Sequence, residues 1–165
     1  MGNVTPRFTG AVLLSIIVAL MLTMIPLREE WLMYRPEWVA LTLIHWSLVA
    51  PNRMSFIVAW LAGLFIDALY GSIIGQHALG FTIVVFMSMR MRTRLVVDNI
   101  FQQFLILFLV LGTYMLVNLW ILGITGDAPR GWVYWSPVIV SLLVWPFYHY
   151  FMRIYHSRKK PFDYQ

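Results

Sequence analysis

The sequence predicts an all-α integral membrane protein in which six transmembrane helices form one bundle. Of its residues 61% are apolar and 16% aromatic, and only 12% are charged, while the mean hydropathy is +0.75. This is about half the charge of an ordinary soluble domain. No linker rich in Pro, Ser or Gly divides the 165 residues. The chain is therefore interpreted as a single membrane domain, 1–165.

The first helix is expected over 8–27, because Phe8–Leu27 holds no charge and is bracketed by Arg7 and Arg28. As a helix this run is about 30 Å long, which matches the hydrocarbon core of a bilayer. A cleavable signal peptide is the alternative interpretation. The apolar core is long for such a peptide and no A-x-A cleavage site follows it, so an uncleaved helix is favoured.

The second helix is expected over 37–50 and is short. The segment before it combines charges with Trp31 and Tyr34, as a loop at the level of the lipid headgroups does. Pro36 is expected to open the helix where its missing N–H costs nothing, and Pro51-Asn52-Arg53 stops it. A helix of about fifteen residues is shorter than the hydrocarbon thickness. Either it lies inside the bundle or the bilayer thins beside it.

The third and fourth helices are expected over 54–70 and 78–89. They are separated by Gly71 and Gly75, which interrupt the apolar run. Gln76-His77 is interpreted as a loop or a re-entrant turn between them. Pro51-Asn52 would form a tight turn that makes the second and third helices antiparallel neighbours.

The fifth and sixth helices are expected over 100–124 and 136–152. Asp98-Asn99 is predicted to cap the fifth helix by accepting from its free N–H groups. Glycine and proline between 123 and 129 end that helix. Aromatic residues over 132–135 form a belt before the sixth helix, which is predicted to be kinked at Trp145-Pro146.

The basic residues are divided unequally between the two ends of the predicted bundle. Nine fall on one side and three on the other, which fits the positive-inside rule when both termini are cytoplasmic. Because they flank apolar runs and are not interleaved with aromatic residues, the net charge of +5 does not indicate binding to nucleic acid. The nine are Arg7, Arg53, Arg90, Arg92, Arg94, Arg153, Arg158, Lys159 and Lys160, and the three are Arg28, Arg35 and Arg130.

Two clusters on the nine-residue side are candidate contact sites at the cytoplasmic face. Each such charge attracts anionic lipid by about 1 kcal/mol. Contact with a cytoplasmic partner protein is the alternative and needs the same residues. The clusters are Arg90, Arg92 and Arg94, and Arg158, Lys159 and Lys160.

The sequence carries no signature of catalysis. It has no cysteine, which excludes disulfides, thiolate metal sites and a cysteine nucleophile. It also lacks a Walker loop, HExxH, GxSxG and paired carboxylates. One His and one Asp in the glycine-rich segment make a poor metal site. We therefore expect no enzyme activity, no metal and no cofactor.

Small residues recur every four positions along the third helix, at Ala59, Gly63, Asp67 and Gly71. Steps of four drift by only about 40° around a helix, so these residues share one face. Glycine on such a face lets another backbone come close. We expect this face to form a close helix contact, either within the bundle or with the membrane helix of a partner.

Asp67 is the acidic residue inside an apolar span, and a buried carboxylate of this kind is a functional-site hypothesis. One interpretation is structural: the carboxylate accepts hydrogen bonds from the broken backbone at 71–75, or pairs with Arg35 or His77. The other is a ligand or ion site. His45 is interpreted as a neutral, hydrogen-bonded packing residue, with a proton carrier as the alternative, while His149 is expected at the headgroups.

In the order of its features the chain resembles the MreD family, the small membrane subunits of the bacterial rod-shape system. The resemblance covers about 8–160 and depends on Arg35-Pro36-Glu37-Trp38, the glycine and aspartate pattern with Ser72, Trp145-Pro146 and a short basic tail. It implies structural or partner-binding roles for Arg35, Pro36, Gly63, Asp67, Gly71, Gly75, Trp145 and Pro146.

The resemblance also implies a function. Members of that family are non-enzymatic subunits of the elongasome in the bacterial inner membrane. They are expected to bind MreC and, directly or indirectly, MreB and the elongation glycosyltransferase and transpeptidase, so that rod shape is maintained. The implied fold is similar to the substrate-binding subunits of energy-coupling-factor transporters. The alternative function is therefore binding or transport of a small solute or lipid precursor in an intramembrane pocket.

Overall fold

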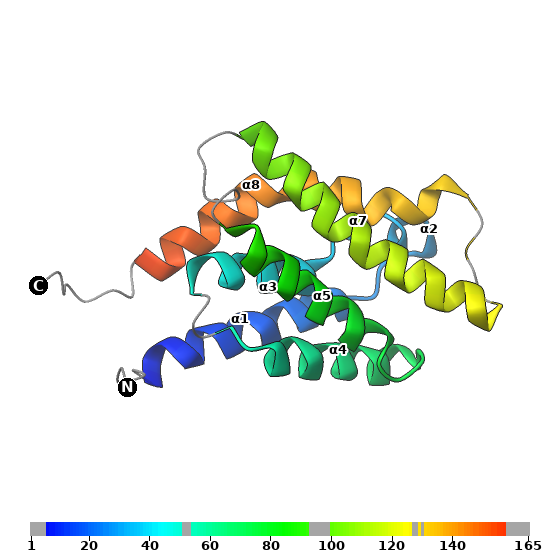
Figure 1. Ribbon diagram of the computed structural model, residues 1–165, viewed down its shortest axis with the longest axis horizontal. Helices are drawn as coiled ribbons and strands as arrows, with labels where there is room; N and C mark the ends of the chain where they lie inside the picture. The colour runs from blue at the N-terminus through cyan, green and yellow to red at the C-terminus, as the bar shows by residue number, and fades with distance from the viewer. Residues whose placement is uncertain (1–5, 51–53, 93–99, 127–128, 130, 158–165) are drawn as a thin grey trace, which may run out of the picture.

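The computed structural model describes residues 6–50, 54–92, 100–126, 129 and 131–157, and the regular secondary structure of this part of the chain is helical, without strands (Figure 1). Each of the six ranges expected from the sequence is overlapped by one long helix. A four-residue helix and a 3-10 helix lie in segments expected to be loop and aromatic belt. The elements are α1 Pro6–Met24, α2 Glu29–Leu32, α3 Trp38–Val49, α4 Phe56–Tyr70, α5 Gln76–Arg90, α7 Ile100–Thr125, η1 Trp132–Trp135 and α8 Ser136–Ser157.

The long helices alternate in direction, so the bundle has two distinct ends. One end, which we call the terminal end, is where α1 begins and α8 finishes, at the left of Figure 1. The other end, the distal end, carries α2, η1 and the connection between α4 and α5. Residues far apart in sequence, such as Arg35, Asp67 and Tyr134, are therefore found toward the same end of the molecule.

Helix α3 forms the centre of the bundle. Its residues 39–48 are all buried, and it packs against α1, α5 and α8. A helix that is apolar on every side is expected to be enclosed by others. Of the two explanations for its shortness, the structure supports the interior position, since twelve residues extend for only about 18 Å.

Several helix ends differ from the expected ranges, each for a local reason. Helix α1 stops at Met24 and not at 27, because the residue before Pro26 is disfavoured in the helical conformation. Helix α3 begins at Trp38 after the cap residue Glu37, so Pro36 precedes the helix and does not occupy its first turn. Helix α8 continues beyond 152 to Ser157 and runs through Pro146.

The interpretation of Gln76-His77 as a loop is wrong, because both residues belong to the first turn of α5. The interpretation of the segment after α1 as a loop is also incomplete, since Glu29–Leu32 forms α2. Other expectations fall outside the described residues: the turn at Pro51-Asn52-Arg53, the cap at Asp98-Asn99, Arg94, and Arg158, Lys159 and Lys160.

Helices α4 and α5 approach each other closely at Gly63. A Cβ placed on Gly63 would lie 2.3 Å from both the Cα and the N of Ala78 and 2.6 Å from the carbonyl carbon of His77. Ala59 and Asp67 lie on the same side of α4 and are buried as well. The part of the small-residue face at Ala59, Gly63 and Asp67 is therefore used inside the bundle, against α5. The expectation that Gly71 belongs to this close contact is wrong, because Gly71 follows the end of α4 with φ of 62° and a Cβ there would meet nothing within 4 Å.

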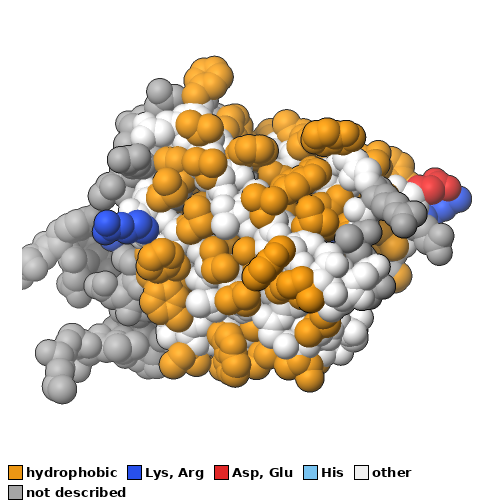
Figure 2. Space-filling model, turned by 45° about the vertical axis from the view of Figure 1, so that its right-hand side comes forward, with side chains coloured by type: hydrophobic (Ala, Val, Ile, Leu, Met, Phe, Trp, Pro, Cys, Tyr) orange, Lys and Arg blue, Asp and Glu red, His pale blue; other side chains and the backbone are white. Residues whose placement is uncertain are grey.

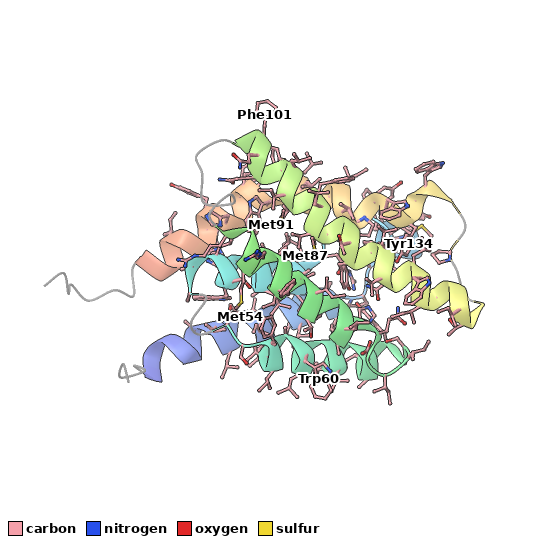
Figure 3. The ribbon with its side chains drawn as sticks, in the orientation of Figure 1. Met54, Trp60, Met87, Met91, Phe101 and Tyr134 are labelled. Atoms are coloured by element: carbon pink, nitrogen blue, oxygen red, sulfur yellow. The ribbon has the colours of Figure 1, made fainter. Side chains whose placement is uncertain are left out.

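The sides of the bundle are apolar. Trp60 and Phe101 point outward from α4 and α7 (Figure 3) and are 48% and 80% exposed. Figure 2 shows hydrophobic side chains across the middle of one face, with the charged side chains it colours at the two ends. Among the described residues, α7 over Phe101–Thr125 is long and apolar enough to cross a membrane by length and composition, and three further apolar helices are shorter.

Substitution of Gly63 by alanine tests the close approach of α4 and α5. The added methyl group overlaps backbone atoms that cannot move aside as a side chain would, so we expect a loss of about 1–3 kcal/mol in the free energy of unfolding. The measurement is the thermal unfolding midpoint of the purified protein in detergent. Gly112→Ala is the matched control, because a Cβ there meets nothing within 4 Å. Equal midpoints for the two variants would contradict the close contact.

Candidate functional site

The carboxylate of Asp67 is the centre of a hydrogen-bonded turn at the distal end. Asp67 is 1% exposed. Its Oδ2 accepts from the backbone N–H of Gly75 at 2.8 Å, and its Oδ1 accepts from the backbone N–H of His77 at 2.9 Å. Ser72 Oγ donates to Oδ1 at 2.8 Å, and His77 Nδ1 lies 2.7 Å from the same oxygen. Both carboxylate oxygens are therefore occupied by donors of the protein itself.

Two glycines make this turn possible. Gly71 ends α4 with φ of 62°, and its N–H donates to the carbonyl of Asp67, while Gly75 precedes α5 with φ of 101°. Glycine adopts such positive φ angles without steric cost. The chain therefore reverses so sharply that a carboxylate near the end of α4 reaches the free N–H groups at the start of α5. A carboxylate is well placed there, since it also complements the helix dipole.

Arg35 has partners other than Asp67. Its guanidinium donates to the carbonyls of Thr23 and Ile25 at the end of α1 and lies within 3.5 Å of the Tyr70 hydroxyl. The last carbonyls of a helix have no partner within it, so Arg35 closes the end of α1 and links it to α4. Of the two pairings considered for Asp67, the structure contains the one with His77.

Glu37 is a polar residue that the sequence analysis did not single out. It lies between Pro36 and α3, is only partly exposed, and its backbone N–H donates to Ser141 Oγ of α8 at 2.9 Å. Its side chain lies beside the Tyr114 hydroxyl of α7. The ion pairs among the described residues join Arg28 to Glu30 and His77 to Asp67, so neither involves Glu37.

The surroundings of Glu37 change its acidity. Withdrawal from water raises the pKa of Glu37 to about 7, and the Tyr114 hydroxyl and the positive charge of Arg35, which lower it, only partly oppose this rise. In the sequence, Glu37 appears only as the first residue of the expected second helix and as part of Arg35-Pro36-Glu37-Trp38. Nothing in the sequence indicated that α7 and α8 would close around it.

Glu37 lines two cavities at the distal end. One has a volume of about 240 Å³ and is bounded by Arg35, Pro36 and Tyr70 among others. The second has about 340 Å³ and extends toward η1, where Tyr134 lies (Figure 3). The residues common to both linings are Glu37, His77, Tyr114 and Pro137.

Tyr114 forms a wall shared by these cavities, and a glycine makes room for it. Its ring stacks on Phe81 with centroids 5.4 Å apart and an interplanar angle of 21°. A Cβ on Gly80 would lie 2.7 Å from the same ring. The position of Tyr114 beside Glu37 therefore depends on a residue of α5 without a side chain.

Histidines also meet inside the bundle. His45 of α3 is fully buried, and its Nδ1 lies 3.2 Å from the Nδ1 of His149. His149 was expected at the level of the headgroups, which stays a prediction; the structure shows that its side chain turns inward to α3. Trp145 is buried beside His149, and the centroids of the two rings are 5.1 Å apart. Pro146 follows within α8 and leaves the carbonyl of Leu142 without its usual helical donor.

The predicted site residues thus fall into separate groups. Gly63, Asp67, Gly71 and Gly75 shape the contact and the turn between α4 and α5, while Arg35 and Pro36 line the first cavity. Trp145 and Pro146 belong to the histidine group.

At the terminal end, the exposed Arg92 donates to the carbonyl of Leu48 at 2.8 Å, and Arg90 is exposed. The described residues contain no cluster of three His, Cys, Asp or Glu side chains suited to a metal ion.

Asp67→Asn tests the role of the carboxylate. An amide has a single oxygen, so in either orientation its NH₂ faces the N–H of Gly75 or of His77. We expect a loss of about 1–3 kcal/mol in the free energy of unfolding. Glu30→Gln is the control, since the Glu30 side chain is 76% exposed and should tolerate the same change. An unchanged unfolding midpoint for Asp67→Asn would show that the carboxylate is not needed.

The raised pKa of Glu37 predicts how stability depends on pH. The folded protein binds this proton more tightly than the unfolded chain does, so its contribution to stability is full below about pH 4.5 and is lost as pH rises through about 7. Glu37→Gln cannot ionise. We expect the unfolding midpoint of the unmodified protein, relative to this variant, to fall between pH 5 and 8. Parallel profiles for the two proteins would refute the shift.

Comparison with known proteins places the chain in a family. The family model of rod shape-determining protein MreD matches residues 6–155. A rod shape-determining protein MreD of Haemophilus influenzae is 28% identical over 140 residues, which cover 83% of this chain and 85% of that protein. No solved structure matches the chain, so the expected similarity to energy-coupling-factor subunits stays a prediction. The chain belongs to the MreD family of rod shape-determining proteins.

Proposed function

We propose that this protein is a non-enzymatic membrane subunit of the bacterial elongasome. In this role it binds MreC and helps to couple the MreB cytoskeleton to the glycosyltransferase and transpeptidase of peptidoglycan synthesis. Family membership supports a role in rod-shape determination. The contacts with MreC and the other named partners are the further part of this proposal, and cell shape would be controlled through them.

The observation that carries the scaffold interpretation is the use made of Asp67. Its oxygens accept from Ser72, Gly75 and His77 and fix the connection between α4 and α5. A carboxylate whose oxygens already accept hydrogen bonds from the protein stabilises the fold and is not available to coordinate an ion. We propose the same kind of role for the other predicted residues: they keep the bundle in the form that the partner recognises. These are Arg35, Pro36, Gly63, Gly71, Gly75, Trp145 and Pro146.

We further propose that the protein crosses the inner membrane six times with both termini cytoplasmic. The apolar sides of the bundle and the apolar length of α7 support a membrane location. Arg90 and Arg92 lie at the terminal end, as the positive-inside rule requires of a cytoplasmic face. In this arrangement they contact anionic lipid headgroups or a cytoplasmic partner, and the cavities beside Glu37 open away from the cytoplasm.

A second candidate function is the binding of a small solute or lipid precursor. The cavity of about 340 Å³ at the distal end favours it, because pockets of this size accommodate small ligands. The two functions are compatible, since a scaffold can also carry a ligand. They differ in that only the second requires the cavity to be filled.

Complementation tests the proposed function. The gene is expressed in a rod-shaped bacterium that lacks its own MreD, together with the MreC from the same source. We expect rods to be restored and MreC to co-purify in mild detergent. Gly63→Ala should reduce both results through misfolding, while Gly112→Ala should reduce neither. Restored rods without co-purified MreC would contradict direct binding, and round cells with normal amounts of protein would contradict the role in shape.

A further inference from the structure

A partly buried carboxylate without an ionic partner lies at the distal end. Glu37 and Tyr114 line the same cavities, and neither ion pair of the described residues includes Glu37. Arg35 lines the neighbouring cavity with Glu37 and acts on it through its charge, but its Nη atoms donate to the carbonyls of Thr23 and Ile25 and do not form an ion pair with Glu37. A carboxylate withdrawn from water is costly unless it is paired. Glu37 therefore retains the capacity to accept from a positively charged donor.

A second acceptor lines the same cavity and comes from a different helix. Asn118 of α7 is 4% exposed, and its amide nitrogen donates to the carbonyl of Tyr114 at 3.1 Å. Its Oδ1 is buried and has no hydrogen-bond partner among the described residues. Buried amide oxygens are seldom left in this state. Glu37 and Asn118 both line the cavity of about 340 Å³.

His77 also lines this cavity, with its Nδ1 held by the Asp67 carboxylate at 2.7 Å. The aromatic and apolar residues of the other walls suit a cation with an apolar attachment. Tyr114 and Tyr134 contribute aromatic rings, and such rings attract ammonium groups through their negative faces. Met33 and Val133 also line it and are 57% and 46% exposed. The cavity thus combines oxygen acceptors with apolar residues on the surface of the bundle, where an acyl chain is able to lie.

We propose that this cavity binds a primary ammonium group, carried either by the headgroup of an aminolipid or by a soluble amine. The N–H groups of the ammonium would donate to the Glu37 carboxylate and to Asn118 Oδ1, and the cation would supply the missing charge. Because the pKa of Glu37 is raised to about 7, binding at neutral pH would favour its ionised form. The proposal does not depend on the binding of MreC.

Lipid binding to the purified full-length protein in neutral detergent tests this proposal. Phosphatidylethanolamine, phosphatidylcholine and phosphatidylglycerol are titrated separately and followed by native mass spectrometry. Phosphatidylcholine is the sharp comparison, because its quaternary nitrogen has the same charge and no N–H donor. We expect phosphatidylethanolamine to bind at least tenfold more tightly than either of the others. Equal affinity for phosphatidylethanolamine and phosphatidylcholine would overturn the proposal. The proposal would also be overturned if the protein bound neither these lipids nor butylammonium.

The source of the ammonium is resolved by competition with butylammonium chloride, using butanol as the uncharged control. Displacement of phosphatidylethanolamine by the amine alone supports a cavity open to soluble amines. Retention of the lipid at millimolar amine supports a headgroup site that needs the acyl chains.

Two variants on different elements connect the binding to this cavity. Glu37→Gln and Asn118→Leu should each weaken phosphatidylethanolamine binding at least tenfold, while the exposed Glu30→Gln should leave it unchanged. Size-exclusion chromatography checks that each variant is folded. If one variant does not fold, the other variant and the comparison of lipids on the unmodified protein still test the proposed site. Wild-type affinity in either folded variant would place the lipid elsewhere and refute the site.

Discussion

One carboxylate determines how the two most closely packed helices of the bundle are joined. Asp67 accepts donors from the turn after α4 and from the first turn of α5, and this fixes where α5 begins. Its burial would be unfavourable without those donors, and the donors at the start of α5 would lack partners without the carboxylate. The direction of α5 in turn brings Ala78 against Gly63, where there is no space for a side chain. The close packing of α4 and α5 and the turn between them are thus two results of one arrangement.

Other polar side chains of the described residues are also hydrogen-bonded within the protein. Hydroxyl side chains on the helices donate to their own backbone, as Ser47, Thr82 and Ser88 do to the carbonyls four residues before them. Arg35 and Arg92 satisfy carbonyls at the ends of α1 and α3. Polar groups in a membrane are costly unless satisfied within the protein. This pattern and the apolar sides of the bundle fit the membrane location of MreD-family proteins.

Glu37 and Asn118 depart from that pattern, which is why they carry the proposal of a bound amine. Gln76 Oε1, Trp145 Nε1 and Arg35 Nε are also buried without a hydrogen-bond partner among the described residues. Glu37 and Asn118 differ from these in that both line the cavity beside η1 and both offer oxygen acceptors to it. Residues that break a local rule of this kind are often functional. The scaffold role and the ligand role would then occupy different parts of the molecule: the α4–α5 contact holds the shape, and the cavity beside α7 and η1 receives the ligand.

The sequence by itself determined the helical class, the approximate place of each long helix and the importance of the Gly63 and Asp67 face, because apolar runs, proline stops and four-residue spacing act locally. It could not choose between the partners of Asp67, since that choice depends on how far the turn at Gly71 and Gly75 folds back. Tertiary structure also decided that α3 is enclosed, that His149 turns inward to His45 and that Glu37 meets Tyr114. Each of these is a contact between segments distant in the chain, and no pattern within one segment specifies the helix that will pack against it.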